Sequence, residues 1–361
     1  MRDSQMDGYH SLRTYFGDIH NHCEVSYGKG PLEAAFRNAR LQLDFLSVTV
    51  HADWPDLPKD DRNLDYLVDY HSRGFKKAVA NWPEYLKAVE QESDEGKFVV
   101  FPSFEWHSNE YGDYCVYFRD TEGASILRAK DLKGLRSEAA KSTPPAILLP
   151  HHIGYKTGAR GINWGAFEES LSPVVEIFSF HGLSETSEGP YPYMHSMGPV
   201  HEHGTAQYGW EQGHRFGVVG SSDHHNAFPG SYGYGRMGVW AEDITRESIW
   251  NALVQRRTYA LTGDRIDLAF SVNGHLMGEL CPPARKRKLA VDVRGGGALD
   301  CIDVLHNNRV IHRENIFPGS DVSDHSKVYV EVGWGEGFES YAWDVELEVV
   351  GGALEDVEPR F

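Results

Sequence analysis

The chain has 361 residues, of which 40% are hydrophobic and 24% charged, and its formal net charge is −18. This composition is that of a globular protein, and no apolar run approaches the ~20 residues that span a bilayer. Nucleic-acid binding draws most of its affinity from Lys and Arg, so the acidic balance disfavours a nucleic-acid partner. Because residues 1–7 lack the apolar core of a secretory signal, we expect a cytoplasmic protein.

Over residues 1–265, short apolar runs alternate with amphipathic segments, which is the pattern of strand–helix units. Helical spacing recurs in residues 31–41, 74–92 and 245–256, where apolar side chains lie three or four positions apart. Segment 181–213 has no periodicity and is predicted to be a long functional loop. The predicted strands are 15–19, 45–50, 98–101, 116–118, 146–149, 174–178, 216–219 and 237–240.

After residue 265 the pattern changes to alternating apolar and polar residues with no helical spacing. Asn273-Gly274 and Asn307-Asn308 are hairpin-type turn signals. We therefore expect two domains, a larger α/β domain over 1–265 and a small β-sandwich over 266–361. The predicted strands of the second domain are 266–272, 288–293, 301–306, 328–332 and 342–350.

Histidines and carboxylates follow the predicted strands. His20 and His22 come directly after the first apolar run, and residues two apart in an extended chain point to the same face. The carboxyl ends of parallel strands converge on one edge of a sheet or barrel, so these side chains are expected to meet there. The later strands end at or near His51, Glu105, His151 and Asp223, with His225 two residues on.

The residue types indicate the metal. Four cysteines without a CxxC pair are read as reduced thiols, and imidazole with carboxylate suits zinc, manganese or iron. More ligands are present than one tetrahedral ion needs, which favours two or three divalent ions. Such a site activates water for hydrolysis, especially of phosphate esters.

Several of these segments resemble successive motifs of the PHP (polymerase and histidinol phosphatase) superfamily, over residues 13–280. The resemblance implies a distorted (β/α)7 TIM-like barrel and a site of up to three metals. Residues 249–266 are similar to a PHP-related branch of uncharacterised bacterial proteins. The motifs are 17–22, 49–53, Glu105, 150–152 and 220–225.

Position by position, the resemblance assigns His20, His22, Glu105 and Asp223 to a first metal. Glu105 bridges to a second metal with His151, and His51 and His225 match a third. The sequence departs from the family at two places. Asp113 is the nearest match to a family histidine, and Tyr27 stands where a third-metal ligand is expected, unless Glu24 replaces it.

Further candidates surround these ligands. His181 is predicted to be a substrate contact or a catalytic acid, and His107 to be a metal ligand or a proton donor, with a structural role as the alternative for His107. A phosphate needs cations opposite its charge, and the candidates are Lys156, Arg160, Arg215 and Arg236.

The leading hypothesis is a metal-dependent phosphoesterase that acts on a small phosphorylated molecule through a metal-activated water. One alternative keeps the metals and hydrolyses an amide, lactone or ester. Another is a scaffold protein with a degenerate metal site, for which Tyr27 is the support. No membrane partner is expected, and the sequence leaves the oligomeric state open.

Overall fold

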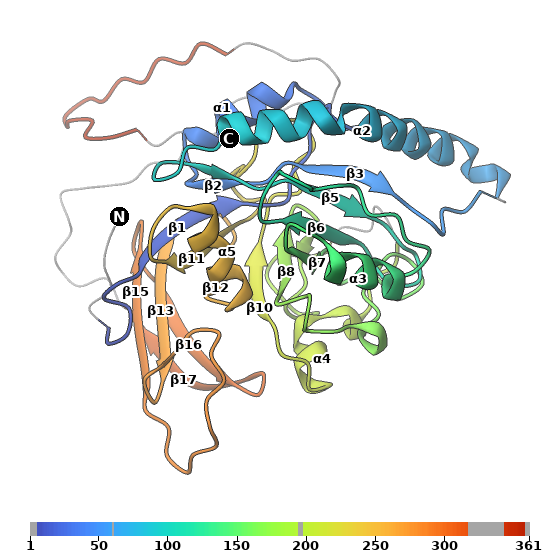
Figure 1. Cartoon of the computed structure of the whole chain (residues 1–361). Helices are drawn as coiled ribbons and strands as arrows, with labels where there is room; N and C mark the ends of the chain where they lie inside the picture. Colours follow the sequence, from blue (N-terminus) through green and yellow to red (C-terminus); the bar gives the residue numbers. More distant parts are fainter. Residues whose placement is uncertain (1–5, 60, 194–197, 317–342, 358–361) are drawn as a thin grey trace. The chain divides into compact units, whose positions relative to one another are not determined.

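A computed structural model describes residues 6–59, 61–193, 198–316 and 343–357 (Figure 1). The chain divides into two compact units, residues 1–294 and 295–359. This division comes later than the boundary predicted at residue 265, and the domain assignment stays a prediction. Among the described residues, no helix is both long and apolar enough to cross a membrane.

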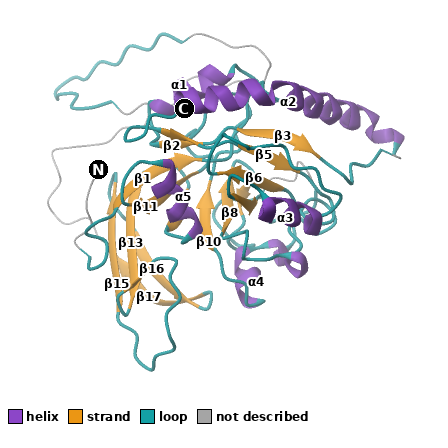
Figure 2. Cartoon of the chain, in the orientation of Figure 1, coloured by secondary structure: helices purple, strands orange, loops and turns teal. Residues whose placement is uncertain are grey.

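The first unit alternates strands with helices, which confirms the mixed α/β class (Figure 2). Its helices are α1 (Leu32–Arg40), α2 (Asp65–Glu92), α3 (Leu132–Lys141), α4 (Ala206–Glu211) and α5 (Arg246–Val254). Its strands are β1 (Arg13–Asp18), β2 (Phe45–Leu46), β3 (Thr49–Asp53), β4 (Val99–Val100), β5 (Ser103–Trp106), β6 (Tyr114–Phe118), β7 (Ala146–Pro150), β8 (Val174–Ser179), β9 (Gly182–Leu183), β10 (Gly217–Gly220), β11 (Arg236–Ala241), β12 (Thr258–Leu261), β13 (Ile266–Val272), β14 (His275–Leu276) and β15 (Leu289–Gly295).

The strands of the site belong to three sheets, ordered β12-β11-β1-β2-β4, β3-β5-β6-β7 and β10-β8-β9. Strands β1, β2 and β4 run parallel, as do β3 with β5 and β8 with β10. Parallel neighbours bring their carboxyl ends to one edge. The hydrogen bonds of the described strands give open sheets, so the closed barrel stays a prediction.

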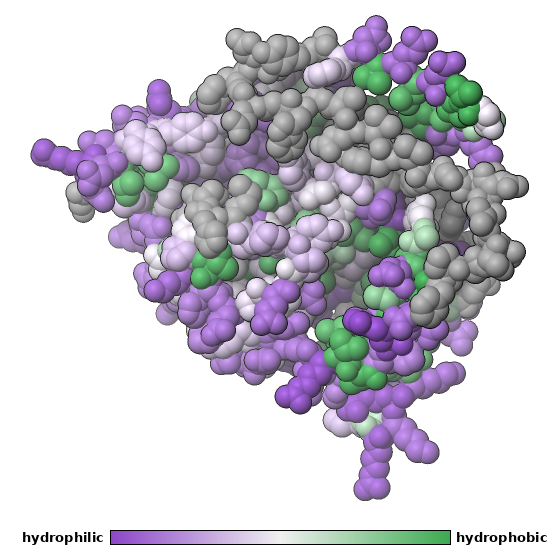
Figure 3. All heavy atoms as spheres, turned by 180° about the vertical axis from the view of Figure 1, so that it is seen from behind, coloured by the Kyte–Doolittle hydropathy of each residue, from purple (hydrophilic) through white to green (hydrophobic). Residues whose placement is uncertain are grey.

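Helices α1 and α2 cover strands β2, β3 and β4 (Figure 2). In α1 the buried side chains Leu32, Ala35, Phe36 and Ala39 recur every three or four residues, and they pack into the core beside Leu46. Helix α2 starts at Asp65, earlier than the predicted residue 74. The prediction missed the first turns because they are mostly exposed and carry no apolar stripe. The face drawn in Figure 3 is mainly hydrophilic, with apolar side chains in separate groups.

Two predicted features of the first unit were incomplete. Helix α3 was missed, although Asp131 caps it by accepting from the Gly134 N–H at 2.7 Å, and Leu135 and Ala139 are buried at helical spacing. The predicted loop 181–213 also contains α4 and β9. Helix α4 spans six residues, too short to show a periodic pattern in the sequence.

The second unit contains the hairpin β16 (Cys301–His306) and β17 (Arg309–Asn315). The predicted turn at Asn307-Asn308 is confirmed, since both residues have positive φ, as tight hairpin turns require. The predicted strand 328–332 lies outside the described residues. The predicted strand 342–350 is wrong over its described part, residues 343–350, because these exposed residues pair with no described strand.

Candidate metal centre

The eight predicted metal ligands lie in one region, seven of them in or shortly after strands and Asp113 at the amino end of β6. His20 and His22 follow β1, His51 lies in β3, and Glu105 lies in β5. The antiparallel strand β6 begins directly after Asp113, and His151 directly follows β7. The remaining two, Asp223 and His225, follow β10. Strand ends therefore position the cluster, as the sequence predicted.

Four side chains form a first group with the spacing of metal ligands. The Nε2 atom of His22 lies 3.1 Å from Nε2 of His20, 3.0 Å from Oδ1 of Asp223 and 3.6 Å from Oε2 of Glu105. The Nε2 atom of His20 lies 3.4 Å from the same Asp223 oxygen and 3.9 Å from the same Glu105 oxygen. Ligands on a tetrahedron with ~2.1 Å bonds are about 3.4 Å apart, so the ligand atoms of His20, His22 and Asp223 fit around one zinc-sized ion, with Glu105 next to both histidines.

Both imidazoles of this group are held with Nε2 toward the cluster. The Nδ1–H of His20 donates to Oε2 of Glu176 at 2.9 Å. The Nδ1–H of His22 donates to the Thr49 carbonyl at 2.8 Å. Hydrogen bonds of this kind fix the tautomer that leaves Nε2 as a lone-pair donor, which is the form that binds a metal.

Glu105 links the first group to a second one. Its Oε1 atom lies 2.9 Å from Nε2 of His151 and 3.1 Å from Nδ1 of His107, and its Oε2 atom faces the first group. Burial alone raises the pKa of Glu105, but the surrounding imidazoles outweigh burial and hold the pKa well below its usual range. Among the described residues Oε2 is buried and makes no hydrogen bond. A buried carboxylate oxygen facing imidazole nitrogens fits a bound cation.

Asp113 is surrounded by donors. Its Oδ2 atom lies 2.9 Å from Nδ1 of His107 and 3.2 Å from Nε2 of His152. The Nε–H of Arg160 donates to the same oxygen at 2.9 Å. Its other oxygen accepts from the Ser108 N–H at 2.9 Å. The predicted ligand is thus also the anchor of a guanidinium.

Of the four predicted phosphate-binding cations, Arg160 contacts the cluster. Its guanidinium touches Asp113 and His107, and it lies 4.8 Å from the Trp54 ring centroid. The described contacts of the other three predicted cations lie elsewhere. Lys156 is exposed, Arg215 pairs at the surface with Glu169, and buried Arg236 donates to Gln42 and Gly230.

Tyr27 occupies the side of the cluster next to His51. The two rings are stacked, with centroids 3.7 Å apart, and Nδ1 of His51 lies 3.0 Å from the Ser26 hydroxyl. Helix α2 makes room for Tyr27 at Gly74, where an added Cβ would lie 2.2 Å from the Tyr27 ring. The suggested replacement, Glu24, is exposed. An aromatic ring thus stands where the resemblance expected a ligand.

The two predicted proton donors both contact the cluster. Nε2 of His181 lies 3.1 Å from Oδ2 of Asp223, and its Nδ1 accepts from the Tyr155 hydroxyl at 2.8 Å. Burial lowers the pKa of His107, but the Glu105 and Asp113 carboxylates outweigh it and raise the pKa to about 9. The charged form of His107 is therefore stabilised while no cation is bound.

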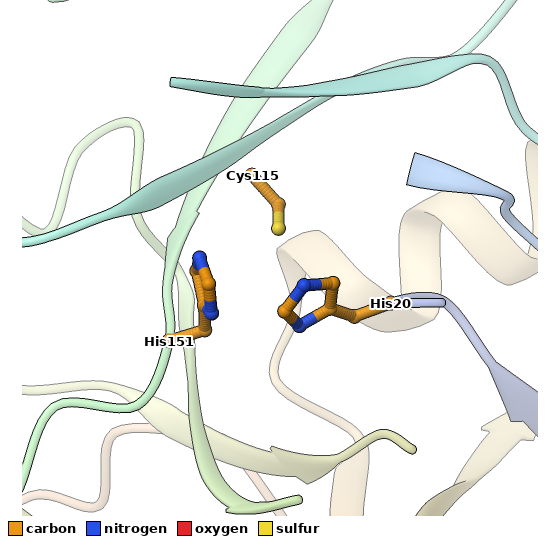
Figure 4. A group of neighbouring side chains, drawn as sticks. All are labelled: His20, Cys115 and His151. Carbon is orange, nitrogen blue, oxygen red and sulfur yellow. The ribbon is translucent and has the colours of Figure 1, made fainter. Parts of the chain in front are cut away.

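Tyr155 and Cys115 were given no role from the sequence. Glu176 was noted there only as a carboxylate within the predicted strand 174–178, and it lies buried in β8. The thiol of Cys115 points toward the space between the rings of His20 and His151 (Figure 4). Burial raises the pKa of this thiol to about 12, so it stays protonated and free, as predicted for the cysteines.

Comparisons with known proteins match parts of the chain. Residues 230–290 match the family model DUF3604, a protein family of unknown function. An uncharacterised protein of Chlamydia pneumoniae is 26% identical over 292 residues, which cover 74% of this chain and 46% of that protein. A Chlamydia trachomatis relative is 25% identical, covering 70% and 44%. The chain thus spans about half the length of these curated relatives.

The chain is also similar to solved structures. One is a two-domain protein from Bacteroides vulgatus that contains a predicted PHP-like metal-dependent phosphoesterase, with 14% identity, a TM-score of 0.45, and coverage of 88% of this chain and 99% of that one. Another is a lesion-specific endonuclease of Pyrococcus furiosus, with 12% identity, a TM-score of 0.36, and coverage of 67% and 56%.

Proposed function

We propose that this chain is a metal-dependent hydrolase of phosphoesters whose strands form a distorted (β/α)7 barrel, with a β-sandwich domain after it. The observation that carries the proposal is the position of Glu105. One of its oxygens lies within 3.9 Å of both His20 and His22, and the other lies 2.9 Å from His151. A carboxylate shared in this way is the bridge that a two-metal hydrolase needs.

The donor atoms favour two ions rather than three. His20, His22, Asp223 and Glu105 would hold the first, and Glu105 and His151 belong to the second. The candidate third group, His22, His51 and His225, uses His22 again. Since Nε2 of His22 faces the first group and its Nδ1–H donates to the Thr49 carbonyl, His51 and His225 remain. The Glu105 oxygen that lies 3.2 Å from Nε2 of His51 is the same oxygen that faces the first group.

Divalent ions at such a site supply Lewis acidity, lowering the pKa of water and polarising a substrate oxygen. The chain's own residues provide the rest. Glu176 and the Thr49 carbonyl orient the two imidazoles that face the first position. Arg160 brings a positive charge, which suits a phosphate dianion. His181, oriented by Tyr155, is placed to hold a proton for the leaving oxygen.

Hydrolysis of a carboxylic ester, lactone or amide is the second candidate. The observation in its favour is that Lys156, Arg215 and Arg236 lie away from the cluster, so that Arg160 is the predicted cation placed beside it. A carbonyl substrate needs no cation opposite a dianion. A single test with both classes of substrate separates the two candidates.

The test uses the purified chain loaded with manganese or zinc on a panel of phosphomonoesters, phosphodiesters, carboxylic esters and lactones. We expect turnover of phosphoesters, and its loss to background in His20→Ala and Asp223→Ala. His10→Ala, which changes an exposed histidine paired with Asp7, is the matched control and should retain activity. Phosphoester turnover that survives both cluster substitutions would refute the proposal, and turnover confined to carbonyl substrates would favour the second candidate.

A further inference from the structure

Four aromatic side chains stand beside the candidate metal centre, on the side where His225 reaches solvent. They are Phe180, His224, Phe228 and Tyr234, named here the aromatic wall. The ring centroids of Phe180 and Tyr234 lie 6.3 Å apart, those of His224 and Tyr234 5.6 Å, and those of His224 and Phe228 6.0 Å. Phe180 also lies 4.1 Å from the His181 ring and 6.0 Å from the His225 ring. The aromatic wall therefore borders the ligands directly.

The wall is accessible. Phe228 is 40% exposed, Phe180 and Tyr234 are half-buried, and the side chain of His225 is 37% exposed. Exposed apolar rings clustered beside polar groups are typical of binding surfaces, since their burial by a ligand is favourable.

The loop that carries Tyr234 is held in place on several sides. Gly230, Gly233 and Gly235 all adopt positive φ, which allows the tight turns of the motif Gly-Ser-Tyr-Gly-Tyr-Gly. Tyr232 packs against Gly263, where an added Cβ would lie 2.9 Å from its ring. One residue of the motif is tied to the site itself, because the Gly230 N–H donates at 2.6 Å to Asp18, the last residue of β1. The backbone that carries Tyr234 is thus held before any ligand arrives, and its ring contacts Phe180 and His224. A preformed surface lowers the entropic cost of binding.

We propose that the aromatic wall binds a flat ring carried by the leaving group of a small phosphoester, and so sets the substrate class. The proposal rests on the proposed function, since the phosphate of the same molecule would lie at the metal centre and Arg160. The planes of Phe180 and Tyr234 lie at 79° to each other, so a flat ring stacks on one of them and meets the edge of the other. A ring stacked on Phe180 is adjacent to His225 and His181. A long nucleic acid is the less fitting occupant, because a net charge of −18 leaves few cations for a phosphate backbone.

The test compares two ligands that differ only in the ring. The non-hydrolysable phosphonate analogues of adenosine 5′-monophosphate and of ribose 5-phosphate are titrated calorimetrically into the manganese-loaded chain. Stacking of a base on aromatic side chains predicts binding of the adenosine analogue that is about tenfold or more tighter. Tyr234→Ala and Phe180→Ala should each remove most of this ratio and leave the affinity for the ribose analogue unchanged.

Two controls keep the result decisive. Tyr234→Phe retains the ring and should retain the ratio, and Tyr66→Ala removes a tyrosine that is 72% exposed on α2, away from the wall, and should have no effect. Equal affinity of the native chain for the two analogues would overturn the aromatic wall and leave the phosphoesterase proposal standing. Because binding is measured without turnover, failure of the substrate panel would overturn the proposed function separately.

Discussion

At the scale of single residues, the site consists of carboxylates and imidazoles that shift each other's pKa. Burial raises the pKa of Glu176 to about 7, against the opposing effect of His20, and one of its oxygens accepts from the His20 imidazole. Burial acts to raise the pKa of Asp223, but the histidines around it have the larger effect and hold the pKa well below its usual range. Each carboxylate thus orients an imidazole or is itself a candidate ligand.

Replacement of Glu176 tests whether it positions His20. We expect Glu176→Ala to weaken metal binding by about 10- to 100-fold, the usual cost of losing the partner of a metal-binding histidine. Glu176→Gln keeps an acceptor oxygen and should lose less. Competition with a chromophoric chelator measures the affinity, and Glu138→Gln at the surface is the control. Unchanged affinity in Glu176→Ala would show that His20 needs no such partner.

A second substitution tests the role of Asp113. Because this carboxylate already has four donors around it, we expect Asp113→Asn to leave the metal content unchanged. The variant should loosen Arg160 and raise KM for a phosphoester several-fold. Metal analysis beside steady-state kinetics separates the two effects. Loss of one ion per chain would instead make Asp113 a ligand, as the resemblance implied.

The sequence predicted the ligands better than their partners. His20 and His22 could be found because their spacing follows from the alternation of an extended chain. Arg160 could not be told apart from Lys156 or Arg215, since all three lie in loops and no local pattern says which loop turns inward. The roles of Glu176 and Tyr155 arise from contacts between distant segments, which no local pattern encodes.

At the scale of elements, α2 is adapted to the site at one position. A glycine inside a helix costs about 1 kcal/mol relative to alanine, yet Gly74 lies inside α2, where the Tyr27 ring packs against it. The Tyr27 ring in turn stacks on His51, a candidate ligand. Gly74 therefore destabilises α2 locally, and it leaves the space in which the Tyr27 ring reaches the cluster.

A double-mutant cycle tests this contact. Gly74→Ala alone should destabilise the chain by about 1–3 kcal/mol despite its better helix propensity, because the added methyl overlaps Tyr27. In the Tyr27→Ala background the same change should be neutral or stabilising by up to about 1 kcal/mol. Urea unfolding of the four proteins gives the coupling energy. Equal effects in both backgrounds would contradict the packing described here.

Element prediction succeeded where one face of a segment is buried and failed elsewhere. The apolar stripe of α1 gave its position to within a residue at each end. The first turns of α2 are exposed, so no stripe marks its start at Asp65. For residues 343–350 the alternation of apolar residues predicts a strand, but these residues pair with no described strand, because alternation alone does not provide a pairing partner.

At the scale of the whole molecule, the mixed α/β class followed from the order of segments, whereas the division into compact units did not. Strands β13 to β15 look like the all-β second half in sequence, but they belong to the first unit together with the site. The pattern of apolar and polar residues changes at residue 265, whereas the first compact unit ends at residue 294. A local pattern cannot show with which core a strand packs.

Bound ions should also stabilise the first unit as a whole. An ion that binds only the folded chain, present at 100 times its Kd, adds about 2.7 kcal/mol to the free energy of unfolding. We expect the melting temperature to fall on treatment with a chelator and to recover when zinc or manganese is restored. The melting temperature of Asp223→Ala, which lacks a ligand of the first ion, should fall less on chelator treatment than that of the native chain. An unchanged melting temperature of the native chain on chelator treatment would argue against a bound cation.

The central claim is that the histidines and carboxylates at the strand ends hold divalent ions. Its most direct test is the metal-to-chain ratio, measured by elemental analysis after metal-replete expression and exhaustive dialysis, for the native chain beside His22→Ala. We expect about two ions per native chain and a loss of at least one in the variant. Fewer than one ion per native chain, or an unchanged ratio in His22→Ala, would contradict it.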